Sequence, residues 1–254
     1  MKTEIKAYLK RIGYEGEPKN DFESLSRLQT QHLRTVPYEN LDIMRDIPLS
    51  LEIEDMYEKI VVRHRGGYCF ELNGLFAWLL RELGFSVVEY MARYLRDEPE
   101  IPMRRHRVLK VSCGDEDFLC DVGVGAVIPR IPLPYVMDKV SEQGAERYKL
   151  GREPFLGIVL YEWKQRAKEW QKLYSFTEEE QLNIDYIMPS FYCEKHPESY
   201  FRSMDMVHLF TEDGRKTVAG REFKIFSAAG VEVMVPGSEE IYEELLAQHF
   251  KIVL

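Results

Sequence analysis

A double glycine, Gly66-Gly67, leads directly into a segment whose apolar residues repeat with the period of one helix face. The segment begins at Cys69 and ends at Gly84, a residue type that readily adopts the left-handed conformation found after helices. Its inward positions are 69, 72, 75, 76, 79, 80 and 83. We therefore expect Cys69 in the first turn of a buried helix, where unpaired backbone N–H groups and the helix dipole favour a thiolate.

Cys69 has two interpretations. On an apolar helix face, a cysteine is more often a small core residue than a catalyst. The preceding double glycine favours a nucleophile, because residues without a Cβ let the backbone approach closely just before the thiol. The choice between the two depends on whether the chain also supplies a base and a group that orients the base.

The composition is that of a folded globular protein, because 45% of the 254 residues are hydrophobic and 12% are aromatic. A net charge of −9 argues against general nucleic-acid binding. No apolar run approaches the roughly 20 residues that span a bilayer, and the first residues lack a secretory apolar core, so we expect a cytoplasmic protein without a membrane partner. The cysteines, at 69, 113, 120 and 193, are too scattered for a disulfide framework or a zinc site, and we expect no metal.

The period of the apolar pattern changes along the chain and predicts an α+β protein in three parts. Residues 1–84 show helical spacing and predict a helical domain that carries the nucleophile. Residues 85–185 predict a β-rich domain and residues 186–254 a mixed α/β domain, and a helix is predicted over 177–191, across the boundary between them. Predicted strands cover 85–95, 105–113, 118–122, 156–163, 168–176, 205–210, 215–219, 222–227 and 231–235, and a last helix starts at Ser238.

His106 and Asp121 are the candidate partners of Cys69. His106 opens the predicted strand 105–113, and Asp121 lies in the next strand, across the turn 114–117. Two antiparallel neighbours joined by a short turn bring such residues close together when the register permits. Facing the start of the helix, they would supply a base and an orienting carboxylate. The alternative is that His106 is a surface residue flanked by arginines and Asp121 a turn residue.

Three stretches resemble the signature blocks of the arylamine N-acetyltransferase family, in that family's order and spacing. They are Thr35-Val36-Pro37-Tyr38-Glu39-Asn40-Leu41-Asp42, Arg65-Gly66-Gly67-Tyr68-Cys69-Phe70-Glu71-Leu72-Asn73-Gly74 and Asp121-Val122-Gly123-Val124-Gly125. The resemblance covers most of residues 20–135 and becomes thin after about residue 140. Its Arg-Gly-Gly-Tyr-Cys block is highly specific.

The resemblance implies a fold and a reaction. The fold is an N-terminal helical bundle, a central β-barrel and a C-terminal α/β lid around a core like that of cysteine proteases. The family's catalytic triad falls on Cys69, His106 and Asp121. Its reaction, a step of xenobiotic metabolism, moves an acetyl group from the co-substrate acetyl-coenzyme A to the cysteine and then to an arylamine, an arylhydroxylamine or a hydrazine. The enzyme is expected as a monomer or a homodimer.

The resemblance also assigns substrate-binding positions, which fall on Tyr38, Tyr68, Phe70, Val124 and Gly125. The family usually has Phe in place of Tyr38 and of Val124, and both positions lie near the acceptor in relatives. Losing an aromatic ring at position 124 is expected to enlarge or soften the acceptor pocket.

We expect different roles for two sets of charged residues near these motifs. Glu39 and Arg65 are expected to form a buried ion pair that locks the helical part to the loop before Cys69. The cluster Arg104-Arg105-His106-Arg107 either supplies positive charge for coenzyme A phosphates or forms the solvated face of an edge strand.

Two other function classes compete with the acetyltransferase. One is a cysteine hydrolase, or an amide synthase or transglutaminase-like acyltransferase, which uses the same triad and differs in whether water, an amine or a peptide accepts the acyl group. The other is a non-catalytic binding module that keeps only the fold. Alkylation of Cys69 separates the enzymes from the module, and dependence on acetyl-coenzyme A separates the acetyltransferase from the hydrolase.

Overall fold

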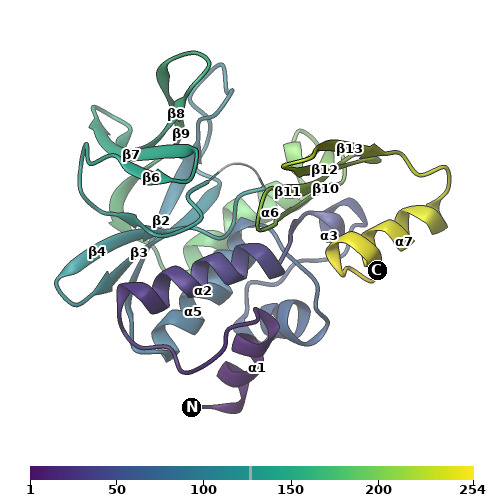
Figure 1. Ribbon diagram of the computed structural model, residues 1–254, viewed down its shortest axis with the longest axis horizontal. Coiled ribbons are helices and arrows are strands. Elements are labelled where there is room, and N and C mark those ends of the chain that lie inside the picture. Colours follow the sequence, from purple (N-terminus) through teal and green to yellow (C-terminus); the bar gives the residue numbers. More distant parts are fainter. Residues whose placement is uncertain (126–127) are drawn as a thin grey trace.

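The computed structural model describes residues 1–125 and 128–254 and shows a mixed α/β fold (Figure 1). Helices of the N-terminal part lie beside a curved sheet of eight strands, and a second sheet of five strands lies on the other side of these helices together with the C-terminal helix. No helix among the described residues is long and apolar enough to cross a membrane.

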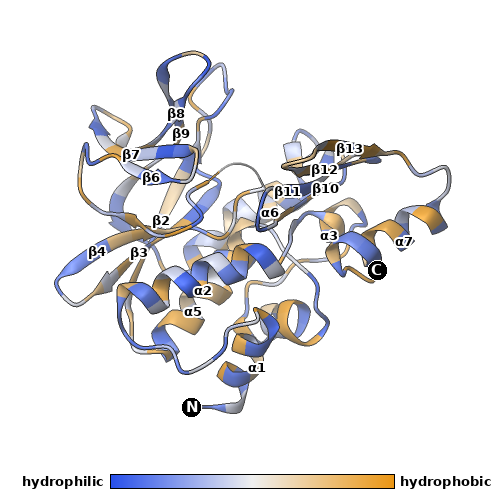
Figure 2. Ribbon diagram, viewed as in Figure 1, coloured by the Kyte–Doolittle hydropathy of each residue, from blue (hydrophilic) through white to orange (hydrophobic). Residues whose placement is uncertain are grey.

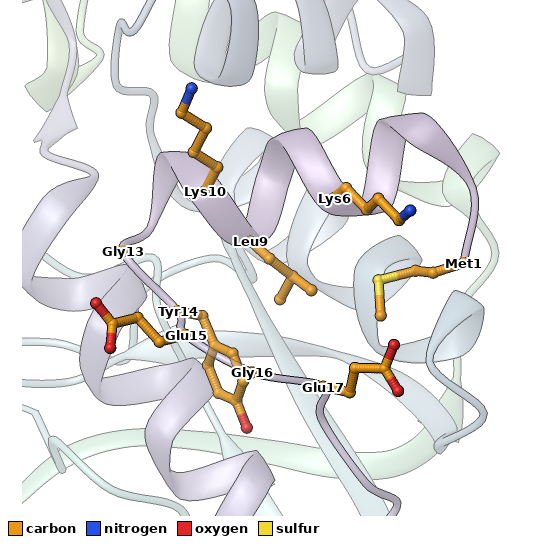
Figure 3. A pocket seen from close by; sticks show the side chains of 9 residues that line it. All are labelled: Met1, Lys6, Leu9, Lys10, Gly13, Tyr14, Glu15, Gly16 and Glu17. Carbon is orange, nitrogen blue, oxygen red and sulfur yellow. The ribbon is translucent and has the colours of Figure 1, made fainter.

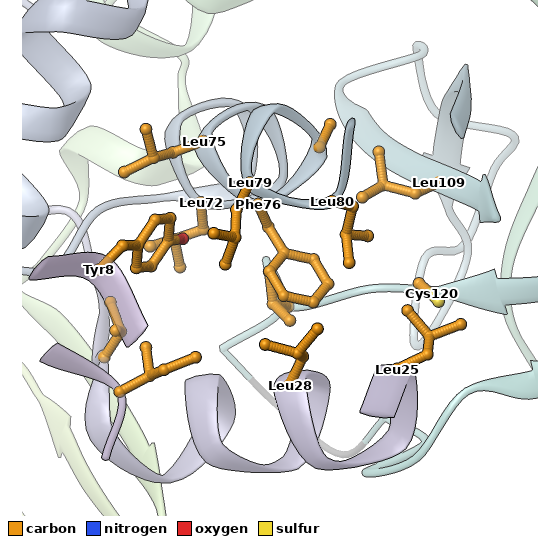
Figure 4. Close-up of a cluster of buried hydrophobic side chains, with 14 of the residues drawn as sticks. Tyr8, Leu25, Leu28, Leu72, Leu75, Phe76, Leu79, Leu80, Leu109 and Cys120 are labelled. Carbon is orange, nitrogen blue, oxygen red and sulfur yellow. The ribbon is translucent and has the colours of Figure 1, made fainter. Parts of the chain in front are cut away.

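The N-terminal part is built around α5, which spans Cys69–Glu82 as the apolar spacing predicts. Most of its 14 residues are buried, including the polar Glu71 and Asn73, so the helix is enclosed around more of its circumference than the single predicted face, and orange stretches mark its hydrophobic residues (Figure 2). Leu72, Phe76 and Leu80 pack with Leu25 and Leu28 of the neighbouring helix α2 (Figure 4). The other helices are α1 Thr3–Arg11, α2 Phe22–Thr35, α3 Leu41–Met44 and α4 Ile53–Tyr57, the last continuing as a π-helical turn, η1 Glu58–Val62.

The eight-stranded sheet curls into a barrel-like form that is nearly closed. Its order is β5-β4-β3-β2-β9-β8-β7-β6, so β5 and β6 are the edges. The side chain of Gln143 on β6 bridges them: its Oε1 accepts from the backbone N–H groups of Arg130 (2.7 Å) and Ile131 (3.1 Å) just before β5. The strands are β2 Ser86–Tyr94, β3 His106–Cys113, β4 Glu116–Cys120, β5 Leu133–Pro134, β6 Ser141–Gln143, β7 Glu146–Glu153, β8 Gly157–Lys164 and β9 Glu169–Glu180.

The predicted hairpin of β3 and β4 is confirmed, with Leu109 opposite Cys120. The predicted helix over 177–191 is wrong in its first part, because β9 continues to Glu180, which pairs with Tyr90 of β2 beyond a bulge. A 3₁₀ turn, η2 Asn183–Tyr186, follows, and the helix α6 Ile187–Lys195 starts only there. Strands β6 and β7, which the sequence pattern did not predict, complete the barrel-like sheet.

The C-terminal part is a five-stranded antiparallel sheet in the order β1-β10-β11-β12-β13. Its four C-terminal strands and its helix lie where predicted, and the Ser238 side chain caps the helix by accepting from the Ile241 N–H at 3.4 Å. The first strand, β1 Tyr38–Glu39, comes from the N-terminal part, so this sheet joins two distant segments of the chain. The elements are β10 Met206–Phe210, β11 Arg215–Ala219, β12 Glu222–Ser227, β13 Gly230–Met234 and α7 Glu239–Phe250, preceded by a short 3₁₀ turn, η3 Tyr200–Arg202.

Candidate active site

A cavity of about 620 Å³ is lined by several of the candidate site residues. Cys69 and His106 both line it, as do Tyr38, Val124 and Gly125. The five-stranded sheet supplies much of the opposite wall, including Met206, His208 and Thr217. The cavity therefore lies where α5, the barrel-like sheet and the C-terminal sheet meet.

Cys69 is the first residue of α5 and only 3% exposed. Its Sγ lies 3.6 Å from the carbonyl oxygen of Arg105, the residue before His106. The backbone N–H of Tyr68 donates to Glu71 Oε2 at 3.1 Å, which fixes the start of the helix. The thiol is thus held at a helix start, in contact with the end of the chain segment that leads into β3.

The pKa of the Cys69 thiol is raised well above its ordinary value, chiefly because the group is buried, and the neighbouring Cys193 and Asp121 add to the rise. The backbone N–H groups of Arg107 and Phe70 act in the opposite direction. The expected preference for a thiolate at the helix start is therefore outweighed by burial. A reactive thiolate at neutral pH requires a base in the same cavity that takes its proton.

His106 is that candidate base, and it is paired with Asp121. The distance from His106 Nε2 to Asp121 Oδ2 is 2.7 Å, and the two residues are 4% and 3% exposed. This bond uses Nε2 and leaves Nδ1 as the ring nitrogen available to a thiol. The ring of Tyr174 on β9 lies over the imidazole, with 5.3 Å between ring centroids. Asp121 was predicted inside a strand but comes one residue after the end of β4.

Asn73 ties these groups together and was not predicted from the sequence. Its Nδ2 donates to the carbonyl oxygen of Arg107 at 2.6 Å and to Asp121 Oδ1 at 2.8 Å, and its Oδ1 accepts from the N–H of Val122 at 2.9 Å. The side chain is fully buried. Its position four residues after Cys69, on the same face of a helix, is the signal that would have identified it.

A buried group of charges surrounds the segment before Cys69. The predicted Glu39–Arg65 pair is confirmed: Arg65 Nε and Nη2 donate to the two carboxylate oxygens of Glu39, each at 2.9 Å. Arg65 Nη2 also donates to Asp42 Oδ1 at 2.9 Å. Lys59 extends the group, with its Nζ at 2.7 Å from Asp42 Oδ2 and 2.8 Å from Glu71 Oε1. The network links β1, α3 and η1 to the start of α5.

Replacing Arg65 with Met is expected to lower the free energy of unfolding by about 3–5 kcal/mol, because the carboxylates of Glu39 and Asp42 lose a buried cationic partner. Chemical denaturation measures the change. Arg63→Met is the matched control, since Arg63 is exposed, and it is expected to change stability by less than about 0.5 kcal/mol. Equal unfolding curves for the two variants would contradict a structural role for the pair.

Two glycines permit the close approach of backbone segments at the site. A Cβ on Gly66 would collide with the carbonyl oxygen of Pro37 and lie 2.8 Å from Glu39 Cγ. A Cβ on Gly123 would lie 2.7 Å from the Cα of Cys69 and 2.6 Å from Asn73 Nδ2. Both contacts are shorter than a real Cβ tolerates, so the loop after Asp121 can rest against Cys69 only with glycine at position 123.

The predicted substrate-binding residues divide into two groups. Tyr38, Val124 and Gly125 line the cavity, and a Cβ on Gly125 would lie 2.5 Å from the Tyr38 ring. The structure does not bring Tyr68 and Phe70 into the cavity lining. Both are completely buried in a core cluster behind it, where the Tyr68 hydroxyl is hydrogen-bonded to Ser190 of α6.

The arginine cluster fits neither of its expected roles as a unit. Arg107 is 2% exposed, pairs with Glu89 and lies 4.3 Å from the ring centroid of Tyr186, so it is a core residue rather than part of a solvated face. Arg105 lines the cavity but is neutralised by Glu98 at 2.8 Å.

A second cavity of about 400 Å³ lies between α1 and the turn that follows it (Figure 3). Lys6 and Lys10 line it together with Glu15 and Glu17. Its opposite charges balance, and it contains none of the candidate catalytic residues. The candidate nucleophile Cys69 and the candidate base His106 line the larger cavity instead.

Comparison with known proteins gives one consistent family. The family model described as N-acetyltransferase matches residues 21–254. An arylamine N-acetyltransferase from Mycolicibacterium smegmatis is 35% identical over 238 residues, which cover 91% of this chain and 86% of that protein.

Solved structures agree with the sequence matches. The Mycobacterium marinum arylamine N-acetyltransferase in complex with CoA superposes with a TM-score of 0.88 at 31% identity, covering 98% of this chain and 92% of that one. An arylamine N-acetyltransferase from Bacillus cereus, described as having a unique Cys-His-Glu catalytic triad, gives a TM-score of 0.92 at 25% identity over 100% of both chains.

Proposed function

Because the chain belongs to the arylamine N-acetyltransferase family and is an acyltransferase, we propose that it transfers the acetyl group of acetyl-coenzyme A to an arylamine through an acetyl-cysteine on Cys69. One observation carries the proposal: the cavity that contains the Cys69 thiol also contains His106, which is bonded to Asp121 at 2.7 Å. The three residues act as a triad like that of cysteine proteases. Arylhydroxylamines, at oxygen, and hydrazines are the further acceptors.

In the first half-reaction, His106 Nδ1 takes the proton of the Cys69 thiol, and the thiolate attacks the thioester carbonyl. Asp121 holds Nε2–H and stabilises the imidazolium. The tetrahedral intermediate collapses by breaking the bond to the coenzyme A sulfur, which leaves as a thiol with the proton from His106. The thioester of coenzyme A and the thioester of Cys69 have similar free energies of hydrolysis, so Cys69 can both accept and release the acetyl group. A serine ester would retain the acetyl group.

In the second half-reaction, the amine attacks the acetyl-Cys69 carbonyl and gives its proton to His106, while the Cys69 sulfur leaves. Aromatic amines are weak bases and reach the cavity uncharged. The oxyanion of each step is stabilised by a backbone N–H, for which the N–H of Cys69 is suited because the first turn of a helix leaves such groups without an intrahelical partner. One such donor is typically worth about 3 kcal/mol.

The C-terminal part covers the site and protects the acetyl-enzyme from water. The chain divides into a helical domain (1–84), a barrel domain (85–185) and a lid (186–254). The lid excludes water, which would otherwise hydrolyse the acetyl-enzyme. The low exposure of Cys69 and His106, and the position of β10 and β11 across the cavity from them, support this role. A cytoplasmic location suits the need for a reduced thiol and for acetyl-coenzyme A.

Release of the coenzyme A thiol distinguishes the acetyltransferase from a hydrolase with the same residues. With acetyl-coenzyme A alone, we expect one equivalent of thiol per enzyme and then slow release. Addition of an arylamine is expected to start continuous release matched by acetylated amine. Rapid turnover without an amine would instead support the hydrolase.

A further inference from the structure

The cavity wall opposite the nucleophile carries a row of polar side chains. Tyr38 of β1 pairs with His208 of β10, and His208 pairs with Thr217 of β11. Residues directly opposite each other in an antiparallel sheet project from the same face. All three line the cavity, so the Tyr38–His208–Thr217 row presents a hydroxyl, an imidazole and a second hydroxyl side by side.

His208, at the centre of this row, has an unused hydrogen-bonding atom. The residue is 4% exposed, and within residues 1–125 and 128–254 its buried Nε2 has no hydrogen-bond partner. A buried polar atom without a partner costs about 1–3 kcal/mol, so a ligand group that reaches it gains the bond that the protein does not provide. Burial, assisted by the charges of Arg215 and Arg130, lowers the pKa of His208 to about 3. The imidazole is therefore neutral at pH 7 and offers one donor and one acceptor without a charge.

The row begins beside the segment that leads to the nucleophile. Tyr38 forms a bridge with Gly67, two residues before Cys69. Neighbouring strands lie about 5 Å apart, so the backbone of His208 lies about 10 Å from the backbone of Gly67. Because Cys69 and His208 both line the cavity, an arylamine whose nitrogen is at the acetyl-cysteine can direct its para substituent across the cavity toward His208.

We propose that the Tyr38–His208–Thr217 row, through His208 Nε2, binds an uncharged hydrogen-bonding group at the para position of the acceptor and so makes the enzyme prefer arylamines with such a group. The inference rests on the proposed function, because it assigns the acceptor class for the second half-reaction. A carboxamide suits the row, because it both donates and accepts. The amides of the coenzyme A pantetheine arm share this chemistry. The experiment therefore distinguishes binding of the acetyl donor, coenzyme A, from binding of the arylamine that accepts the acetyl group.

The test uses the two half-reactions separately. Acetyl-enzyme is prepared with acetyl-coenzyme A, freed of excess donor and mixed with 4-aminobenzamide or 4-methylaniline, and loss of the acetyl group is followed by mass spectrometry of quenched samples. In His208→Phe, the ratio of the rate with the benzamide to the rate with the methylaniline is expected to fall about tenfold, the effect of one lost hydrogen bond. His249→Phe, the same change on α7 outside the cavity lining, controls for the substitution itself.

An unchanged ratio in His208→Phe would overturn the proposal. If the unchanged ratio came with a tenfold slower acetylation of Cys69 by acetyl-coenzyme A, the Tyr38–His208–Thr217 row would bind coenzyme A and not the arylamine. If His208→Phe fails to fold, Thr217→Val removes a half-buried hydroxyl of the same row at nearly constant shape, and its ratio is expected to fall about threefold. Failure of wild-type Cys69 to become acetylated would refute the proposed function itself, whereas acetylation with an unchanged ratio refutes only this inference.

Discussion

Replacing Asp121 with Asn is expected to slow acetylation of Cys69 by about 10³–10⁴-fold. The Asn carbonyl oxygen can keep the bonds that Asp121 Oδ1 accepts from Asn73 and Gly123, which leaves the amide nitrogen facing His106 Nε2. Nε2 must then accept a hydrogen bond, so the ring proton moves to Nδ1, the atom that takes the proton of the thiol in the proposed mechanism. Rapid-mixing measurement of coenzyme A release in the first turnover gives the rate.

Asp121→Glu is the matched control for the Asp121 prediction, because it keeps an acceptor for His106. We expect Asp121→Glu to retain far more activity than Asp121→Asn. If the Asn variant were as fast as the wild type, Asp121 would not set the tautomer of His106.

Replacing His106 with Gln is expected to reduce alkylation of Cys69 by iodoacetamide at pH 7 by at least about 100-fold. Without the imidazole, the thiol has to ionise at its own pKa, which burial raises well above the ordinary value. A raised pKa means less thiolate at neutral pH, and the thiolate fraction then grows about tenfold with each pH unit until the pH passes that pKa. The rate in the variant should therefore climb through the alkaline range, while the wild-type rate should already be high near pH 7.

Cys69→Ala, treated in the same way, measures labelling of the other cysteines, which are all buried. Equal rates and equal pH profiles for wild type and His106→Gln would contradict the role of His106 as the base.

Local pattern was sufficient to predict α5, the β3–β4 hairpin and the four C-terminal strands, because each depends on residues that are neighbours in sequence. The same holds for Cys69 at the helix start. The last residues of β9 were not predicted, because residues 177–180 form a strand only through pairing with β2, against their local helical spacing. Closure of the barrel-like sheet by the Gln143 side chain is likewise a contact between segments whose proximity no local pattern encodes.

In the candidate site, too, contacts that follow from short motifs were predicted from the sequence, and contacts that depend on distant segments were not. The proximity of His106 and Asp121 followed from one hairpin, and the Glu39–Arg65 pair from two motifs. The raised pKa of Cys69 depends on how completely the surrounding elements bury it, which the helix pattern alone does not give. His208 had no sequence signal, because its place beside Tyr38 depends on the pairing of β1 with a strand far along the chain.

The most direct test of the central claim is the intact mass of the purified protein after incubation with acetyl-coenzyme A, with Cys69→Ala treated in parallel, followed by addition of an arylamine. We predict that the wild type gains one acetyl group, that the Ala variant gains none, and that the arylamine removes the group as acetylated amine appears. Absence of the adduct in the wild type, or equal labelling of the Ala variant, would contradict transfer through Cys69.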